Sequence, residues 1–346
     1  MHILVTNDDG VQAPGLLALA QELRQIGKVT VFAPDHNWSA SGHVKTLHKP
    51  LRIKETTLAD GTKAMATDGA PSDCVALALL GMVKDIDMVI SGINPHANIG
   101  DDVTYSGTVT AALEAAIANL PGIAVSVHTT SAFQGERDYR SSAVAGRHVA
   151  ELVIEKGLPP RTALNVNVPH LPYDQIKGYR ITHQGIRIYK DALIVQHDPK
   201  GKPMYWIGGE YPSAHMDEGS DFHAIENGYV SITPLQLDLT DHKIIPELQT
   251  WKWDGLIEVV DELLNGDIAL LGPNPAKRFF EQAGPIGKKA FDLFLAPFAQ
   301  HFPFFYFRKD PGQGFLQPAG PVFEKPLYGD FFIHHFRPEG NGRFYH

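Results

Sequence analysis

Short apolar runs alternate with segments of helical periodicity along the first half of the chain. Short apolar runs bounded by turn residues predict buried strands of a parallel sheet, and the segments between them predict crossover helices. The expected strands are residues 3–6, 29–33, 88–91, 123–127 and 164–168. The expected helices are residues 14–26, 72–83, 106–119 and 139–156, and a two-stranded excursion is expected near residues 44–67. This order predicts a Rossmann-like three-layer α/β/α sandwich over residues 1–170.

The first expected helix has a signal at each end. Pro14 suits the first helical turn, because its missing N–H has no partner there in any helix. Gly27 suits a left-handed cap after the last turn. These signals predict a helix that runs from Pro14 to the residue before Gly27.

The pattern changes after about residue 170. Short runs separated by Gly, Asp and Pro predict a C-terminal antiparallel β-region over residues 171–255, with a projecting hairpin at about 191–208. A projecting hairpin has free edges, and pairing with another subunit is one way to cover them. A homodimer or homotetramer is therefore expected.

The last part of the chain, residues 256–346, has a different composition. Fifteen of the eighteen phenylalanines lie there, between Phe279 and Phe344, among many prolines and glycines. A loosely packed appendage and a segment produced by an altered reading frame both fit this composition. The segment contains no catalytic motif, and its role is unknown.

Composition narrows the classes of partner. The chain has 346 residues and a net charge of −9, which gives no general attraction for nucleic acid duplexes or anionic membranes. A phosphate-bearing substrate therefore needs a local site. The single cysteine, Cys74, excludes an internal disulfide and fits a reducing compartment. Neither a signal-peptide pattern nor an apolar stretch of about 18 residues is present, so a cytoplasmic protein without a membrane span is expected.

The segment that follows the first expected strand carries adjacent carboxylates, Asp8 and Asp9. Open α/β sheets bind ligands at the carboxyl ends of their strands, and Gly10 relaxes the backbone enough to turn both acids toward one ion. Two hard oxygen anions suit Mg²⁺ or Mn²⁺. An Asx turn that caps the next helix would also explain the two acids.

Three further segments follow strands at the same predicted edge. The polar loops 34–42 and 91–102 supply neutral oxygen ligands, and residues 105–110 open an Ala-rich helix with two hydroxyls beside its unpaired N–H groups. A helix start of this type binds phosphate, although capping by Ser106 would explain its sequence as well. Their common location at one sheet edge favours a shared functional site.

Residues 1 to about 253 resemble the SurE family of metal-dependent 5′/3′-nucleotidases. The resemblance rests on ordered segments across that range: Asn7-Asp8-Asp9-Gly10 with Ala13-Pro14-Gly15, Ala33-Pro34-Asp35 with Asn37 and Ser39, residues 69–75, Ser91-Gly92-Ile93-Asn94, residues 98–102, residues 105–109, Asn165-Val166-Asn167-Val168-Pro169, and residues 228–235.

The resemblance implies catalytic roles for Asp8 and Asp9 in one domain, residues 1–255. It also implies one divalent metal ion per subunit, Mg²⁺ or Mn²⁺, held by Asp8, Asp9, Ser39 and Asn94. The expected phosphate-binding residues are Asn98, Ser106, Gly107 and Thr108. The implied reaction is hydrolysis of nucleoside 5′- and 3′-monophosphates, other small phosphomonoesters or short polyphosphates, in a dimer or tetramer assembled through the C-terminal β-region.

Two segments depart from the family pattern. Pro95-His96-Ala97 replaces a stretch in which relatives usually carry glycine, and Ala40 replaces a common glycine after Ser39. Both changes stiffen loops that approach the metal or the substrate. An altered substrate preference or a lower rate is the expected consequence.

Three other hypotheses compete with metal-assisted hydrolysis. A covalent aspartyl-phosphate route usually has two aspartates separated by one residue, unlike adjacent Asp8 and Asp9. A dinucleotide-dependent oxidoreductase requires a G-x-G-x-x-G turn after the first strand, and this turn is absent. A metal- and nucleotide-binding regulatory module with little turnover remains the main alternative, favoured by the stiff segment at Pro95.

Overall fold

The computed structural model describes residues 1–130, 133–210, 212–251, 253, 307–308 and 317–318. The chain divides into two units, Met1–Asp241 and His242–His346. In the second unit the described elements are α6 (Ile245–Leu248) and the antiparallel pair β14 (Phe307–Arg308) and β15 (Gln317–Pro318). Most of the aromatic tail, residues 256–346, lies outside the described residues.

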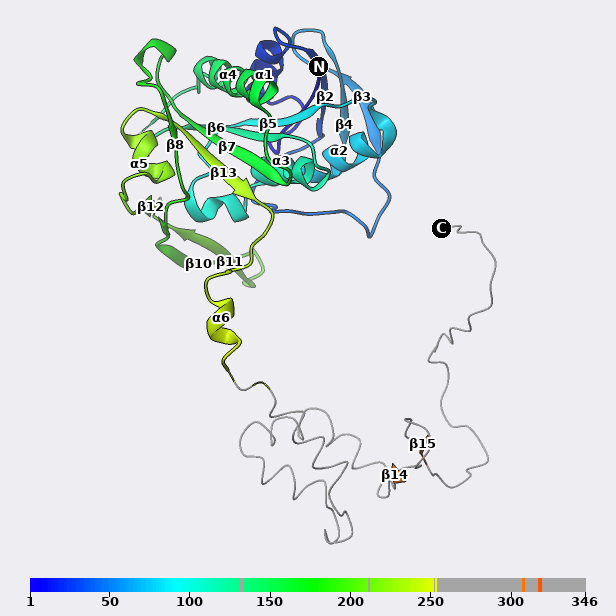
Figure 1. Cartoon of the computed structure of the whole chain (residues 1–346), viewed down its shortest axis with the longest axis vertical. Coiled ribbons are helices and arrows are strands. Elements are labelled where there is room, and N and C mark those ends of the chain that lie inside the picture. Colours follow the sequence, from blue (N-terminus) through cyan, green and yellow to red (C-terminus); the bar gives the residue numbers. More distant parts are fainter. Residues whose placement is uncertain (131–132, 211, 252, 254–306, 309–316, 319–346) are drawn as a thin grey trace. The chain divides into compact units, whose positions relative to one another are not determined.

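The first unit is built on one nine-stranded sheet (Figure 1). Its strands are β1 (His2–Thr6), β2 (Lys28–Pro34), β3 (Ile53–Thr57), β4 (Lys63–Thr67), β5 (Met88–Asn94), β6 (Gly122–His128), β7 (Thr162–Pro169), β8 (Tyr179–Ile181) and β13 (Val230–Gln236). The spatial order is β3-β4-β2-β1-β5-β6-β7-β13-β8. The six strands from β4 to β7 are parallel, so their carboxyl ends meet at one edge.

Helices cover both faces of this sheet. They are α1 (Pro14–Leu23), α2 (Pro71–Leu77), α3 (Gly107–Ile117), α4 (Arg140–Lys156) and α5 (Asp221–Glu226), with the short turns η1 (Ala78–Met82), η2 (Gly100–Thr104) and η3 (Tyr173–Gln175). Helix α1 packs beside α4, and α2 packs beside α3. Figure 1 shows these two pairs on opposite faces of the sheet.

The side chains of strand β1 point alternately to the two faces of the sheet and pack against both helix layers. Ile3 and Val5 pack in a buried cluster with residues of α1 and α4, whereas Leu4 packs in a second cluster with residues of α2 and α3. Successive side chains of a strand point to opposite faces, so a continuous apolar strand supplies both cores. The predicted Rossmann-like three-layer fold is confirmed.

The observed helix boundaries differ from the predicted ones at two glycines. Helix α1 ends at Leu23, and Gly27 does not adopt a positive φ; a Cβ at Gly27 would lie 2.9 Å from the carbonyl oxygen of Met1. The left-handed cap expected at Gly27 is therefore wrong, and the close approach of the backbone at Met1 explains the glycine. The predicted helix 72–83 is α-helical only to Leu77, and Gly81 takes a φ of 126° near its end.

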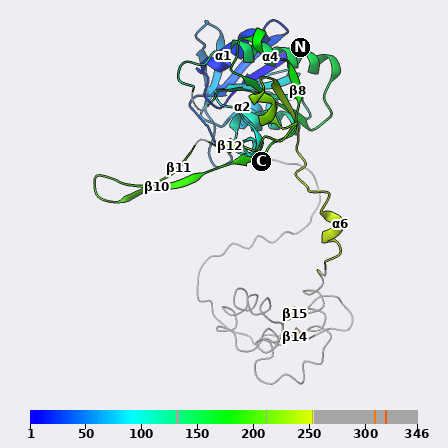
Figure 2. The same cartoon turned by 90° about the vertical axis from the view of Figure 1, so that its left-hand side faces the viewer.

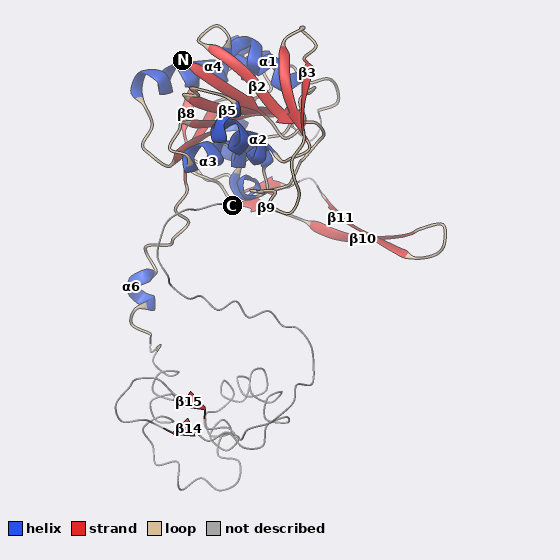
Figure 3. Cartoon of the chain, turned by 90° about the vertical axis from the view of Figure 1, so that its right-hand side faces the viewer, coloured by secondary structure: helices blue, strands red, loops and turns tan. Residues whose placement is uncertain are grey.

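The C-terminal β-region is less separate than its sequence suggests. Strand β13 pairs antiparallel with β7 and parallel with β8, so both strands extend the main sheet. Two antiparallel pairs lie apart from this sheet in the first unit: β9 (Arg187–Ile188) with β12 (Ser213–Ala214), and β10 (Asp191–His197) with β11 (Pro203–Gly209). Strands β10 and β11 form the predicted hairpin, which projects from the unit (Figures 2 and 3).

Both faces of the hairpin carry apolar side chains. Leu193 is opposite Ile207 on one face, and Ile194 is opposite Trp206 on the other. All four are exposed, with Ile207 at 89%. A two-stranded ribbon with two apolar faces and free edges has no core of its own.

Candidate functional site

A cavity of about 290 Å³ lies at the carboxyl edge of the parallel strands. Five of the predicted site residues line it: Asp8, Ser39, Asn94, Asn98 and Ser106. They come from the loops after β1, β2 and β5, from the last residue of β5 and from the N-cap of α3. The fold therefore brings together residues that are up to 98 positions apart, as the order of the strands predicts (106 − 8 = 98).

Asp8 is buried against the start of α3. The Thr108 hydroxyl donates a hydrogen bond to Asp8 Oδ1, and backbone N–H groups of Gly107 and Thr108 also point at this carboxylate. Burial is the larger influence and raises the pKa of Asp8, although these hydrogen bonds oppose it. Thr108 thus directs its hydroxyl to Asp8, and its predicted contact with phosphate stays a prediction.

Asp9 lies beside Asp8 with an unsatisfied oxygen. Burial raises the pKa of Asp9 to about 7, the charge of Asp8 adds to this increase, and Arg137 opposes it. Asp9 Oδ2 is buried and accepts no hydrogen bond from any residue that the structure describes. Two neighbouring buried carboxylates repel each other when both are ionised, so the pair favours a cation.

Three contacts hold the loop that carries Ser39 against Asp8 and the start of α3. The Trp38 N–H donates to the Asp8 carbonyl oxygen at 2.7 Å, and the Gly42 N–H donates to the Tyr105 carbonyl oxygen at 2.9 Å. The Thr110 hydroxyl donates to the Gly42 carbonyl oxygen at 3.1 Å. Ser39 itself is exposed and lines the cavity.

Asn94 stands at the end of β5, where the register with β6 shifts between Gly92 and Asn94. Such an irregularity re-aims side chains beside active sites. The Asn94 Nδ2 group donates to the His96 carbonyl oxygen at 2.5 Å, which fixes the amide. Gly15 of α1 allows this arrangement, because a Cβ there would lie 2.3 Å from the Ile93 carbonyl oxygen.

Buried asparagines hold Asn98 from beneath. Its carbonyl oxygen accepts from Asn165 Nδ2 at 2.7 Å and from Asn167 Nδ2 at 3.0 Å, and its own Nδ2 donates to Ser126 Oγ at 2.8 Å. These contacts give Asn165 and Asn167 of β7 a positioning role that their sequence pattern did not reveal.

A buried carboxylate fixes the next turn of this loop. Asp221 is fully buried and accepts from the Gly100 N–H at 2.7 Å and from the Gly185 N–H at 2.9 Å. The loop after β5 is therefore held to the segment that precedes β9.

The site's donor atoms fit a hard divalent cation. Asp8 and Asp9 supply carboxylate oxygens, Ser39 a hydroxyl and Asn94 an amide oxygen, which are the ligand types that Mg²⁺ and Mn²⁺ take. The unsatisfied Asp9 Oδ2 supports this fit. No group of three or more His, Cys, Asp or Glu residues arranged to hold a metal occurs in the described part, so any such site combines two acids with neutral oxygens.

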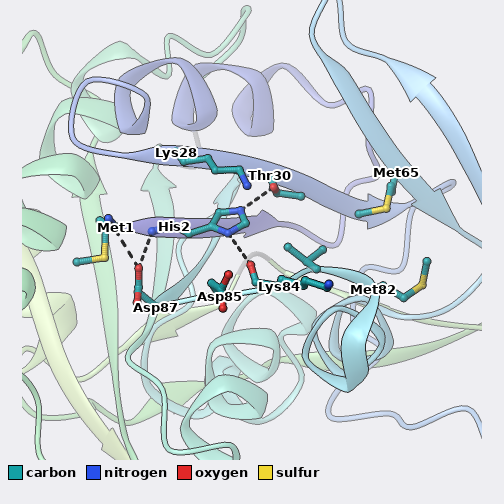
Figure 4. A pocket seen from close by; sticks show the side chains of 10 residues that line it. Met1, His2, Lys28, Thr30, Met65, Met82, Lys84, Asp85 and Asp87 are labelled. Carbon is teal, nitrogen blue, oxygen red and sulfur yellow. Dashed lines mark hydrogen bonds and ion pairs between the residues drawn. The ribbon is translucent and has the colours of Figure 1, made fainter.

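A larger cavity, of about 710 Å³, lies at the opposite edge of the sheet around His2 (Figure 4). The ring nitrogens of His2 are already paired: Nδ1 contacts the Lys84 carbonyl oxygen and Nε2 contacts Thr30 Oγ1, each at 2.8 Å. The His2 N–H donates to Asp87 Oδ2 at 2.7 Å. Size favours this cavity, but the smaller one is lined by Asp8 and by residues at the strand ends, so we assign the site there. Asp9 and Gly107 directly follow lining residues in the chain, and Thr108 follows Gly107, but these three residues do not line the cavity themselves.

Three further cavity residues have no role predicted from the sequence, although two of them lie in segments that the sequence marks as functional. Asp102, Tyr105 and Arg187 line the cavity, and Arg187 reaches it from β9, far along the chain. The Arg187 Nε atom lies 2.9 Å from Asp102 Oδ2. Hydrophobic and polar residues alternate around Arg187 as in an ordinary surface strand. Only tertiary packing therefore brings Arg187 to the cavity.

Ala40 adopts a φ of 56°, in the left-handed region that favours glycine. Replacing Ala40 by glycine is therefore expected to raise the free energy of unfolding by about 0.5 to 1 kcal/mol, because relief of strain exceeds the added entropy of the unfolded chain. Urea unfolding of both proteins measures the difference. Ala97→Gly is the matched control, since Ala97 has no positive φ, and we expect it to be neutral or destabilising. Equal effects of the two changes would show that Ala40 is not strained.

No helix in the described part of the chain is both long and apolar enough to cross a membrane.

Three comparisons with known proteins agree on one family. The model of the family described as Survival protein SurE matches residues 3–191. A 5′-nucleotidase SurE from Chloroflexus aggregans is 49% identical over 255 residues, which are 73% of this chain and 100% of that protein. Another from Geobacter sulfurreducens is 48% identical over 252 residues, covering 72% and 94% of the two chains. The crystal structure of a SurE protein from Aquifex aeolicus matches with a TM-score of 0.62 and 40% identity, over 72% of this chain and 98% of that one.

Proposed function

The chain belongs to the SurE family and is a 5′-nucleotidase, and we propose that it hydrolyses nucleoside 5′- and 3′-monophosphates with one divalent metal ion per subunit. The observation that carries this proposal is the meeting of Asp8, Ser39 and Asn94 in one cavity, from three separate strand ends. The start of α3 lies beside them, with Ser106 among the lining residues.

The proposed metal ligands are Asp8, Asp9, Ser39 and Asn94, and the ion is Mg²⁺ or Mn²⁺. A bound divalent ion supplies charge neutralisation at the phosphoryl group and lowers the pKa of water. The oxygen-only ligand set and the unsatisfied Asp9 Oδ2 support this choice.

The chain's own residues bind and orient the substrate. Asn98 and the N-terminal turn of α3, at Ser106, Gly107 and Thr108, hold phosphate oxygens through amide, hydroxyl and backbone N–H donors. A water oxygen then attacks phosphorus, and the ester P–O bond breaks to give nucleoside and inorganic phosphate. Asp9 is the proposed acceptor of the water proton, through the carboxylate oxygen that does not bind the ion, and it returns this proton to the leaving ester oxygen.

Two further proposals concern the assembly and its setting. The exposed apolar ribbon β10–β11 supports a homodimer or homotetramer in which another subunit covers its faces. The single buried cysteine, Cys74, is consistent with the cytoplasm.

Phosphate release from a substrate panel tests the proposed function. We expect the chain to release phosphate from nucleoside 5′-monophosphates in Mg²⁺ or Mn²⁺, and to lose at least about 100-fold of this rate in excess chelator, because the ion contributes several kcal/mol to the barrier. Nucleoside 3′-monophosphates and a short polyphosphate belong in the same panel. Restoring the ion after chelation is the control and should restore the rate.

Full activity in chelator would contradict the metal-dependent mechanism. The regulatory alternative gives a different pattern, in which the chain binds nucleotide in the presence of metal but releases no phosphate from any member of the panel. Equilibrium binding measured on the same preparations therefore separates the two functions.

A further inference from the structure

The cavity extends beyond the acid pair and the start of α3. Its volume of about 290 Å³ is close to the lower bound for sites that enclose a small organic molecule, about 300 Å³. Asp8, Ser39, Asn94, Asn98 and Ser106 account for the part that the phosphate would occupy. Asp102, Tyr105, Arg187 and Pro212 also line the cavity, and no role in phosphate binding or metal binding is assigned to them.

Tyr105 is one of these additional lining residues. It directly precedes Ser106, so its backbone lies one residue from the proposed phosphate contacts. Its N–H donates to the Asp102 carbonyl oxygen at 3.1 Å, and its carbonyl oxygen accepts from the Gly42 N–H at 2.9 Å. Tyr105 lines the cavity and is 60% exposed, so it is accessible to a ligand there. An accessible aromatic ring on a fixed backbone is a platform on which a nucleobase stacks.

Asp102 is held in a defined orientation beside Tyr105. The Tyr189 hydroxyl donates to Asp102 Oδ1 at 2.6 Å, and Arg187 Nε lies 2.9 Å from Asp102 Oδ2. Each carboxylate oxygen has two acceptor positions, so these partners leave acceptor capacity at an acid that lines the cavity. A fixed carboxylate of this kind accepts hydrogen bonds from ribose hydroxyls.

Residues around β9 hold Asp102 and its neighbour Asp101 in place. The Arg187 N–H donates to Asp101 Oδ2 at 3.1 Å, and the Arg187 side chain is only 7% exposed. Arg187 Nη1 lies 3.4 Å from the carbonyl oxygen of Pro212. Arg187 therefore connects Asp102 to the segments just before β10 and just after β11. It also neutralises the charge of Asp102, which keeps this carboxylate in place.

Resting on the proposed function, we propose that Tyr105 and Asp102 form the nucleoside subsite of this cavity. The Tyr105 ring stacks on the base, and the Asp102 carboxylate accepts hydrogen bonds from the ribose hydroxyls. Arg187 is a positioning residue that orients Asp102. These three residues would thereby set how strongly the base and the ribose hydroxyls contribute to substrate preference.

Ratios of kcat/KM among three substrates test this subsite. Adenosine 5′-monophosphate carries base and hydroxyls, ribose 5-phosphate lacks the base, and 2′,3′-dideoxyadenosine 5′-monophosphate lacks the hydroxyls. Tyr105→Ala is expected to lower the preference for adenosine 5′-monophosphate over ribose 5-phosphate by about 10-fold to 100-fold, mainly through KM, because base stacking is lost. Tyr105→Phe keeps the ring and should retain the preference.

Asp102→Asn tests the second contact independently. It is expected to lower the preference for adenosine 5′-monophosphate over its dideoxy analogue by about 10-fold, since a charged acceptor is removed. A loss of activity that is equal for all three substrates would leave the ratios unchanged and would overturn the subsite, because it indicates a structural role. Loss of the base preference in Tyr105→Phe would overturn it as well. If the unaltered chain released phosphate from none of the three, the proposed function itself would fail.

Discussion

Replacing Asp8 by asparagine is expected to lower kcat by about 1,000-fold or more, because one of two proposed metal-binding carboxylates is lost. Asparagine keeps an oxygen that accepts the hydrogen bond of the Thr108 hydroxyl, so the packing between Asp8 and α3 is retained. Burial also disfavours the charged form of Asp8, and the neutral amide avoids that cost. Activity should therefore fall without loss of the fold.

Steady-state phosphate release at saturating substrate measures this effect, and circular dichroism checks the fold. Asp174→Asn is the matched control, because Asp174 is exposed in η3, away from the cavity, and the same chemical change there should leave the rate within about 2-fold. A rate for Asp8→Asn within about 10-fold of the unaltered chain would exclude Asp8 as a metal ligand of catalysis.

Gly107→Ala is expected to lower kcat/KM by about 100-fold, through displacement of Asp8 from the start of α3. A Cβ on Gly107 would lie 2.8 Å from Asp8 Cβ, 3.1 Å from Asp8 Oδ2 and 3.2 Å from Ser41 Oγ. Contacts below 3.0 Å between carbons require movement, and movement here shifts both a proposed metal ligand and a proposed phosphate contact. A displacement of about 1 Å is sufficient for an effect of this size.

Gly146→Ala in α4 is the control for this substitution. A Cβ on Gly146 would meet side-chain atoms of Val125 and Leu19 at 3.2 and 3.3 Å, outside the cavity. Any loss of stability in this control appears in urea unfolding, whereas kcat/KM should change by only a few-fold. Full activity of Gly107→Ala would show that Asp8 and α3 need not approach so closely.

The sequence predicts the sheet and the acid pair because their signals are local. The apolar run at Ile3, Leu4 and Val5 indicates a strand buried on both faces, and the structure confirms that both cores use it. Asp8 and Asp9 follow that strand directly, so the rule for carboxyl edges is enough to place them.

The remaining parts of the site depend on packing between distant segments. Arg187 lies on a two-residue strand, β9, and reaches the cavity only because Asp101, Asp102 and Pro212 hold it. No periodicity or spacing encodes such contacts. Gly107 belongs to the same class, since its need for a missing Cβ arises from Asp8, about a hundred residues earlier.

Asp221 has a broader consequence for how this enzyme keeps its shape. Its carboxylate ties Gly100 to Gly185, and so connects a loop after β5 with a segment 85 residues later (185 − 100 = 85). A protein with a single thiol has no cystine to staple distant loops together. Here the hydrogen bonds of one buried carboxylate connect the two segments. This connection forms during folding without an oxidant and is unaffected by reducing conditions.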